Sequence, residues 1–277
     1  MCRKVWHGMS VSRHPDGVTC SRPSLCTYSS AMSAEPQADR VRTEQVDRVM
    51  VIHLDDGKAN ALSPAMMAAI NAALDAAEAD DTIGAVVLHG RPGVFCAGFD
   101  LSVMRAGDLA AVVAMVADGG SLVHRLYGSS LPVVAACTGH ALAAGALVLL
   151  GCDVRIGQQP DGEATHRIGL NEVAIGMVLP AWAMTIAVER LSRRHLQRAV
   201  ANARITDAPG AVEAGYLDEL APAGEVLDVA IARAQDLAAV LHRRAYIGTV
   251  AALRGDVLAR MGAEIAADRA AGTVPSV

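Results

Sequence analysis

Aromatic residues are scarce in this chain: they make up 3% of its 277 residues, although 52% of the residues are hydrophobic. The core must therefore be built from Ala, Val, Leu, Ile and Met, which predicts an α/β protein rich in helices. A basic excess is also missing, because the formal net charge is -5, so no contact with nucleic acid or an anionic membrane is expected. The basic residues that cluster from Arg190 to Arg198 are typical of a solvated helix face, and RNA binding near Arg194 is the least supported hypothesis.

No pair of cysteines has the C-x-x-C spacing of a zinc or redox site. Three of the six cysteines fall in apolar runs, and the other three fall near the N-terminus. The first three are Cys96, Cys137 and Cys152, and the others are Cys2, Cys20 and Cys26. This distribution favours buried thiols in a reducing compartment over disulfides or a metal site, so we predict a cytoplasmic protein without a bound metal.

The first 40 residues lack hydrophobic periodicity, and they lack an apolar run of the length that a secretory signal needs. We predict that residues 1–40 form a disordered N-terminal extension. Met32 opens a more ordinary start, MSAEP, so we also hypothesise that translation begins there. Mass spectrometry of native protein that begins at Met1 would contradict this hypothesis.

Beyond residue 40, hydrophobic patterns with the periods of strands and helices follow one another. Residues 41–54 alternate around a turn at Asp47-Arg48, which predicts a β-hairpin. Ser63 stands before Pro64 and an apolar stripe, which is typical of a capped helix start. The other predicted elements are strands at 84–89, 133–137 and 154–156, and helices at 108–127, 142–150, from Pro180, 193–200, 209–214, 226–242 and 250–267. The Gly119-Gly120 pair is expected to weaken the helix at 108–127.

The most hydrophobic stretch, from Leu131 to Cys152, is long enough to resemble a membrane span. Pro132, the break at residues 138–140 and the polar exit at residues 153–155 favour a different interpretation. We predict a strand, a glycine turn and a buried helix here, and no membrane span.

The segment from Val94 to Leu101, VFCAGFDL, is an apolar run that turns at one glycine and leaves an acid behind it. Gly98 has no Cβ, so the chain can turn sharply there and bring a backbone N–H close to a ligand. Asp100 can start a helix, and it is better suited to cap that helix than to react. A donor aimed into a pocket at such a turn can hold an anion or an oxyanion. Many ordinary strand-to-helix turns share this pattern, so the segment alone leaves both interpretations open.

Four segments, in this order, resemble motifs of the enoyl-CoA hydratase/isomerase, or crotonase, superfamily. They are DGKANAL at 56–62, FCAGFDL at 95–101, TGHALAAGALVLLGCDVRI at 138–156 and IGLNEVAIGM at 168–177. The resemblance implies an α/β fold, a crotonase-like spiral of ββα units at 41–220 with a helical C-terminal trimerisation region at 221–277. It also implies an acyl-CoA thioester as the substrate, no cofactor beyond the coenzyme A of that substrate, and a homotrimer or a dimer of trimers.

The resemblance further implies roles for individual residues. The backbone N–H groups of Phe99 and Ala144 would hold the thioester carbonyl, whose oxygen gains negative charge when a proton is moved beside it. Contacts with substrate or coenzyme A are implied at Lys58, Ala59, Ala61, Leu62, Cys96, Ala97, Gly98, Asp100, His140 and Leu147. Simpler alternatives stay open for some of these, because Lys58 can be a solvated side chain, His140 can merely fill space and Cys96 can be a core thiol.

Glu172 and Leu147 bear on which reaction is expected. Hydratases of the family typically use two glutamates, and the resemblance places Leu147 at the first position and Glu172 at the second. Hydration usually shares its proton transfers between two carboxylates, whereas moving a double bond from the 3,4 to the 2,3 position needs one base. The string IGLNE followed by Pro180-Ala181-Trp182 is similar to the Δ3,Δ2-enoyl-CoA isomerases. We therefore predict an isomerase of fatty-acid metabolism with Glu172 as its base, the pKa of which is raised by apolar surroundings.

Two alternatives to this isomerase remain. An enoyl-CoA hydratase is possible if another group replaces the acid that Leu147 lacks. A non-catalytic acyl-CoA-binding protein would explain the lost glutamate directly. Without the flanking motifs, Glu172 itself could be an acid that simply ends a helix.

Overall fold

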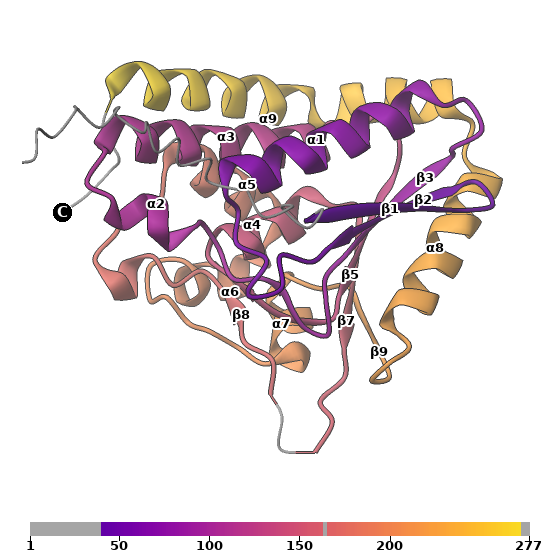
Figure 1. The fold of residues 1–277 in the computed structure, drawn as a ribbon, viewed down its shortest axis with the longest axis horizontal. Coiled ribbons are helices and arrows are strands. Elements are labelled where there is room, and N and C mark those ends of the chain that lie inside the picture. The colour runs from indigo at the N-terminus through magenta and orange to yellow at the C-terminus, as the bar shows by residue number, and fades with distance from the viewer. Residues whose placement is uncertain (1–39, 163–164, 273–277) are drawn as a thin grey trace, which may run out of the picture. The chain divides into compact units, whose positions relative to one another are not determined.

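The computed structural model describes residues 40–162 and 165–272, so the predicted N-terminal extension and the start at Met32 lie outside the described residues. Figure 1 shows how the described elements are arranged. The strands are β1 (Val41–Val46), β2 (Val49–Leu54), β3 (Ala85–His89), β4 (Gly93–Cys96), β5 (Val133–Cys137), β6 (Gly139–Leu142), β7 (Val154–Gln158), β8 (Ile168–Gly169) and β9 (Glu219–Ala221). The helices are α1 (Pro64–Ala79), α2 (Leu101–Arg105), α3 (Leu109–Tyr127), α4 (Ala144–Gly151), the 3-10 turn η1 (Val173–Ile175), α5 (Ala181–Arg190), α6 (Arg193–Ala199), α7 (Ala208–Ala214), α8 (Val226–Val240) and α9 (Arg243–Ala271).

Two sheets organise the described residues. The larger sheet has the order β1-β2-β3-β5-β7-β9, and all its neighbours are parallel except the β1–β2 hairpin. The smaller sheet has the order β4-β6-β8 and is parallel throughout. Each parallel pair needs a crossover connection, and helices or loops between the strands supply it. The predicted α/β class and the spiral of strands and helices are confirmed.

The larger sheet separates two apolar layers because its side chains alternate between its faces. Val86 and Leu88 of β3 face a core that also contains α1, α3 and α4. Ala85 and Val87 face α8, whose Ala230, Ala234 and Ala238 recur every four residues along one stripe. In Figure 1, α8 (orange) runs along this face of the sheet, whereas α9 (yellow) lies over α3 on the other side.

Local sequence explains several of the element boundaries. The hairpin turns at Asp47, whose φ of 52° is a conformation that Asp tolerates. The Ser63 hydroxyl accepts a hydrogen bond of 3.1 Å from the Met66 N–H, and Pro64 occupies the first position of α1. Asp108 caps α3 in the same way, by accepting from the Ala111 N–H at 3.1 Å. The predicted hairpin and both helix starts are therefore confirmed.

Three predicted boundaries are wrong. Residues 139–142 form β6 instead of a glycine turn, because Gly139 packs so closely on β4 that a Cβ would overlap the backbone of Gly93. The neighbouring helix, α4, accordingly begins at Ala144 and not at residue 142. The last helix, α9, begins at Arg243, well before residue 250. The short strands β8 and β9 have too few residues for a period to be visible in the sequence.

One described helix, α3, is long and apolar enough to cross a membrane by length and composition. Its apolar stripe is buried, however, with Met115, Leu122 and Leu126 each 1% exposed or less. The stretch from Leu131 to Cys152, which was expected to resemble a span, is divided among β5, β6 and α4. The predicted strand and buried helix within that stretch are confirmed.

Candidate active site

The small parallel sheet determines where the candidate site lies. Because β4, β6 and β8 are parallel, their carboxyl ends meet at one edge. Ala97 follows β4, Ala143 follows β6, and Asn171 and Glu172 come shortly after β8. These residues line one cavity of about 410 Å³. Three of the four sequence motifs therefore converge on the same cavity.

Gly98 orients the backbone of the first of these motifs. Its φ is 102°, a conformation that L side chains rarely adopt. After this turn, Leu62 pairs with Phe99: the Leu62 N–H donates to the Gly98 carbonyl at 2.8 Å, and the Asp100 N–H donates to the Leu62 carbonyl at 3.3 Å. In such a parallel bridge, the N–H of the middle residue points to the other side. Among the described residues, the Phe99 N–H donates to no backbone acceptor.

Ala144 supplies a second N–H group of this kind. It is the first residue of α4, so its N–H has no partner inside the helix. The preceding Ala143 has a φ of 50°, a strained conformation that is often found at functional sites. A Cβ on Gly98 would lie 3.8 Å from the Ala144 nitrogen, which places the two motifs side by side. Two backbone donors, from Phe99 and Ala144, are therefore available at the end of the small sheet, where an oxyanion could accept from both.

The cavity is mainly apolar, with a few polar groups. Its lining comprises Ala97, Phe99, Leu101, Met104, Arg105, Val116, Ala143, Leu147, Asn171, Glu172, Ile175, Met177, Val178, Pro180 and Trp182. Among these described lining residues, Glu172 is the one carboxylate and Arg105 the one basic residue. An apolar pocket with few convergent polar groups is typical of a site for a small organic substrate.

Glu172 is buried, with 8% of its surface exposed, and its Oε2 atom has no hydrogen-bond partner among the described residues. Burial raises the pKa of this carboxyl, and it outweighs the N–H groups of Glu172 and Asn171, which lower the pKa. A carboxylate that is hard to ionise holds a proton more readily than a solvated one. A buried carboxyl group of this kind can act as an acid or a base.

The loop at residues 56–62 is tied to the first motif by hydrogen bonds. The Asp56 carboxylate accepts from the N–H groups of Lys58, Asn60 and Ala61 at 2.7 to 3.1 Å. Burial raises the pKa of Asp56, whereas the hydrogen bonds from these N–H groups lower it. Together the hydrogen bonds outweigh burial, so the pKa of Asp56 lies below its ordinary value. The loop then joins the motif where the Ala97 N–H donates to the Ala59 carbonyl at 3.0 Å.

The side chain of Asn60 connects this loop to the neighbouring strands by hydrogen bonds. Its side chain is fully buried, and its amide donates to the Leu54 carbonyl at 2.8 Å and to the Phe95 carbonyl at 3.2 Å. Asn60→Ala leaves both carbonyls without this donor and places Ala at a φ of 50°. We expect the free energy of unfolding to fall by about 2–4 kcal/mol, measured by urea denaturation. The exposed Asn202→Ala is the control, and equal stability of the two variants would contradict this account of the loop.

The structure brings some of the predicted site residues together and leaves others apart. Ala97, Phe99, Leu147 and Glu172 line the cavity, and Ala144 adjoins it through Ala143. Gly98, Ala59, Ala61 and Leu62 contribute to the backbone framework just described, and Cys96 is the last residue of β4. The Cys96 thiol is buried, and burial raises its pKa to about 12, so it stays protonated.

The other three predicted site residues, His140, Asp100 and Lys58, also lie outside the cavity lining. His140 accepts from the Arg167 N–H through Nδ1 at 2.9 Å, and its ring meets the ring of His166 edge-on. Asp100 caps α2 by accepting from the Ser102 N–H at 2.8 Å, as its position predicted. Lys58 is exposed in its loop, where its carbonyl accepts from Arg91. Contacts of these residues with a substrate stay predictions.

Several lining residues were not predicted from the sequence. Met104, Arg105, Val116, Asn171 and Trp182 belong to this group, together with Leu101, Ala143, Ile175, Met177, Val178 and Pro180. Leu101, Ala143, Asn171, Ile175 and Met177 lie inside the quoted motifs, which did not mark them individually as lining residues. The others are mostly apolar side chains that resemble core residues in sequence. For Trp182, the available signals were its place in the Pro180-Ala181-Trp182 segment and the scarcity of aromatic residues.

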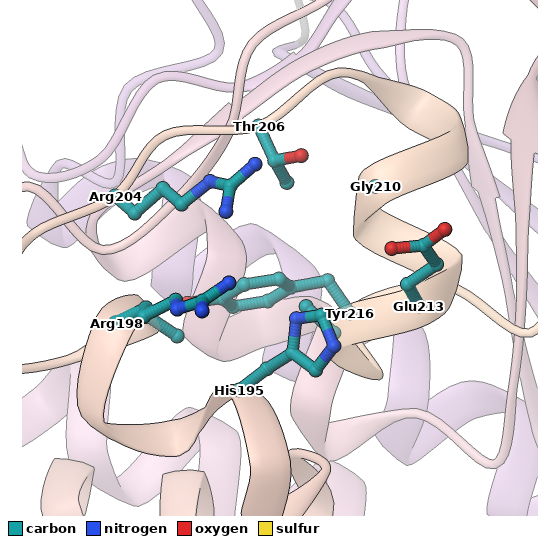
Figure 2. A pocket seen from close by; sticks show the side chains of 9 residues that line it. His195, Arg198, Arg204, Thr206, Gly210, Glu213 and Tyr216 are labelled. Carbon is teal, nitrogen blue, oxygen red and sulfur yellow. The ribbon is translucent and has the colours of Figure 1, made fainter.

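A second hollow lies beside α6 and α7, and Figure 2 shows its polar side chains around the ring of Tyr216. His195 and Arg198 come from α6, Glu213 comes from α7, and Arg204 lies on the loop between these helices. The volume of this hollow is about 20 Å³, which is enough for roughly one water molecule. It cannot hold an acyl thioester, and the cavity beside Glu172 is the better candidate site.

Two backbone donors beside a buried carboxylate, on a spiral of strands and helices, are features of the class of acid–base enzymes that act next to a carbonyl group. Comparison with known proteins places the chain more narrowly. Residues 44–260 match the sequence profile of the family described as Enoyl-CoA hydratase/isomerase. The chain belongs to this family, the crotonase superfamily, as its four motifs predicted.

Individual relatives carry both activities in their names. The chain is 35% identical over 198 residues to a putative enoyl-CoA hydratase of Thermus thermophilus, covering 69% of this chain and 74% of that protein. It is 32% identical over 199 residues to human mitochondrial enoyl-CoA delta isomerase 1, covering 71% of this chain and 65% of that protein. These relatives agree with membership of the family. Their names include both a hydratase and an isomerase, so they do not distinguish hydration from isomerisation.

Solved structures give the same result. A Mycobacterium tuberculosis enoyl-CoA isomerase is 38% identical with a TM-score of 0.78, covering 84% of this chain and 98% of that one. Another structure of the same M. tuberculosis protein describes it as a probable enoyl-CoA hydratase, with 39% identity, a TM-score of 0.79, and coverage of 84% and 96%. The fold is thus shared at high similarity, while the two descriptions of that protein differ.

Proposed function

We propose that the protein is a Δ3,Δ2-enoyl-CoA isomerase that moves a proton with the single carboxylate of Glu172. The observation that carries this proposal is the composition of the cavity: of its described lining residues, Glu172 is the one carboxylate, and Leu147 stands where hydratases of the family typically have a second. One base is sufficient for a double-bond shift, because the proton that it removes can be returned to another carbon.

The proposed reaction begins with the thioester carbonyl oxygen accepting hydrogen bonds from the Phe99 and Ala144 N–H groups. The Glu172 carboxylate removes a proton from C2 of the 3-enoyl chain, and the electron pair of that C–H bond delocalises onto the carbonyl oxygen. The two donors stabilise the resulting enolate. The protonated Glu172 then gives the proton to C4, and the double bond is left between C2 and C3. No atom is gained or lost.

The burial of Glu172 gives this proposal a dependence on pH. The base must be ionised to act, and burial raises its pKa above the ordinary value of 4.5. We therefore expect kcat/KM to increase with pH through a limb that lies above 4.5, and to be lost at lower pH as Glu172 takes up a proton. The measurement is the rate of formation of the conjugated thioester across pH. A rate that stays constant down to the ordinary carboxyl range would argue against Glu172 as the base.

Enoyl-CoA hydration is the second candidate, and one observation favours it. Asn171 lines the cavity beside Glu172, and its buried Oδ1 atom has no hydrogen-bond partner among the described residues. A free acceptor at this position could hold a water molecule for attack at C3. The hydratase names of several relatives point the same way.

A panel of coenzyme A esters separates these candidates. Purified protein is given a 3-enoyl-CoA and, separately, a 2-enoyl-CoA, and products are identified by chromatography and mass spectrometry. Conversion of the first to a 2-enoyl-CoA at a higher kcat/KM than hydration of the second supports the isomerase. Faster formation of a 3-hydroxyacyl-CoA supports the hydratase. Tight binding without turnover of either ester would support the non-catalytic acyl-CoA-binding alternative.

Other properties remain proposals from the family resemblance. These are the homotrimer or dimer of trimers, the role of the C-terminal region 221–277 in assembly, and the absence of a cofactor other than the coenzyme A of the substrate. Analytical ultracentrifugation of the purified protein tests the first of them.

A further inference from the structure

Two consecutive glycines lie in the middle of α3, at Gly119 and Gly120, although glycine destabilises a helix interior relative to alanine. Both are buried in the structure. From the sequence they were expected only to weaken the helix. Their surroundings show a packing reason for them, because each is covered by an aromatic side chain that also lines the cavity.

Gly119 is covered by the ring of Phe99. A Cβ at Gly119 would overlap Cε1 of this ring and lie 2.5 Å from Cζ, closer than real Cβ atoms approach a neighbour. These are the far atoms of a side chain that can rotate. Alanine at residue 119 therefore forces the ring to move, and any movement of the ring changes the cavity because Phe99 is part of its lining.

Gly120 is covered by Trp182 at the start of α5. A Cβ at Gly120 would lie 2.8 Å from Cε2 of the indole and 3.0 Å from Cγ1 of Ile265, so it would be enclosed between α5 and α9. Trp182 is 1% exposed and is also part of the cavity lining. The two glycines therefore let both aromatic rings pack directly against α3, and the positions of these rings help to shape the cavity that they line.

The remaining lining near these rings is apolar. Leu101 and Met104 of α2, Val116 of α3 and Leu147 of α4 contribute hydrocarbon surface. The polar groups come from elsewhere: Asn171 and Glu172 follow β8. Arg105 of α2 is a charged residue among these apolar lining residues, and it is exposed to solvent. An unbranched hydrocarbon chain suits this apolar surface, because moving each methylene group out of water lowers the free energy.

We propose that Gly119 and Gly120 are specificity-determining residues that keep the acyl part of the cavity open for unbranched, apolar acyl chains longer than butenoyl. The side chains of Phe99 and Trp182 line this space, and the two glycines determine how closely each side chain packs against α3. This proposal rests on the acyl-CoA function proposed above and deepens it by naming the class of acyl group.

The test compares Gly119→Ala and Gly120→Ala with wild type on a series of linear 3-enoyl-CoA esters from butenoyl to dodecenoyl. Each methylene group excluded from an apolar site lowers kcat/KM by roughly 10- to 200-fold. We expect wild type to prefer the longer esters, and each variant to lose at least about tenfold in kcat/KM for dodecenoyl-CoA relative to butenoyl-CoA. Gly255→Ala is the matched control, because it is also a helical glycine and its Cβ would meet nothing within 4 Å.

A second variant keeps the test decisive if Gly119→Ala folds poorly. Phe99→Leu in the Gly119→Ala background shortens the displaced side chain, and it is expected to recover the relative rate with dodecenoyl-CoA. Thermal unfolding of every variant shows whether a loss is one of folding. An unchanged chain-length profile in folded Gly119→Ala and Gly120→Ala would overturn the proposal.

The same panel distinguishes this inference from the function on which it rests. If wild type neither isomerises nor hydrates any ester, the proposed function fails, whatever the variants do. If wild type turns over the series but prefers butenoyl-CoA, only the chain-length inference fails. An ester with a terminal carboxylate, which Arg105 could attract, is included, and its preferred turnover would overturn the assignment to apolar chains.

Discussion

Glu172→Gln is expected to lower kcat/KM for a 3-enoyl-CoA by about 10²- to 10⁴-fold, the usual contribution of a positioned acid–base group. Glutamine has nearly the same shape but cannot take a proton from C2 or return one at C4. The variant is also expected to bind the ester about as well as wild type, since the two backbone donors at Phe99 and Ala144 are unchanged. The measurement is steady-state kinetics, combined with calorimetry of binding to a non-reactive acyl-CoA.

Stability separates this effect from misfolding. Burial raises the pKa of Glu172, so the folded protein binds this proton more tightly than the unfolded chain does. The resulting contribution to stability is fully present below the unfolded pKa and is lost as pH rises through the folded pKa. Where Glu172 is ionised, Glu172→Gln removes the cost of a buried charge, and the unfolding temperature of the variant should be no lower than that of wild type. The exposed Glu213→Gln on α7 is the control, and similar activity of both variants would sink the proposed mechanism.

Gly98→Ala is expected to lower kcat by about 10²- to 10³-fold, the effect of losing one oxyanion donor. Gly98 has a φ of 102°, and a Cβ there would lie 3.2 Å from both the Ala143 Cβ and the Leu142 carbonyl oxygen. Relief of this crowding moves the Phe99 N–H away from the Ala144 N–H. Because the donors act mainly on the charged intermediate, kcat should fall more than the affinity for the ester.

Gly224→Ala is the matched control for this prediction. Gly224 also has a positive φ, 82°, but a Cβ there would meet nothing within 4 Å. It therefore shares the backbone strain of the Gly98 variant, about 1–2 kcal/mol, without its crowding. We expect it to lower the unfolding temperature slightly and to leave kcat unchanged. If both variants lose the same activity, strain alone explains the result and the role of Gly98 in holding the donor is wrong.

Much of the fold could be predicted from local sequence. The β1–β2 hairpin, the Ser63 cap of α1 and the burial of α4 follow from patterns a few residues long. The candidate site was predicted to the extent that it depends on contiguous motifs. Phe99 and Glu172 belong to such motifs, and both line the cavity.

What the sequence did not predict depends on contacts between distant segments. The strand β6 exists because Gly139 fits against β4, and β8 has only two residues that pair with it. The positive φ of Ala143 is imposed at the junction of β6 and α4, since alanine has no intrinsic preference for it. Gly119 was expected only to weaken α3, whereas in the structure the ring of Phe99 packs directly against it.

One proton can be followed to test the central claim that Glu172 alone moves it. A 3-enoyl-CoA with deuterium at C2 is converted in ordinary water under single-turnover conditions, and mass spectrometry and deuterium NMR locate the label in the product. Because Glu172 is only 8% exposed, it should return part of the deuterium before exchange with solvent, so label is predicted at C4 of the 2-enoyl-CoA. A product with no deuterium at C4, or a labelled 3-hydroxyacyl-CoA as the main product, would contradict the account.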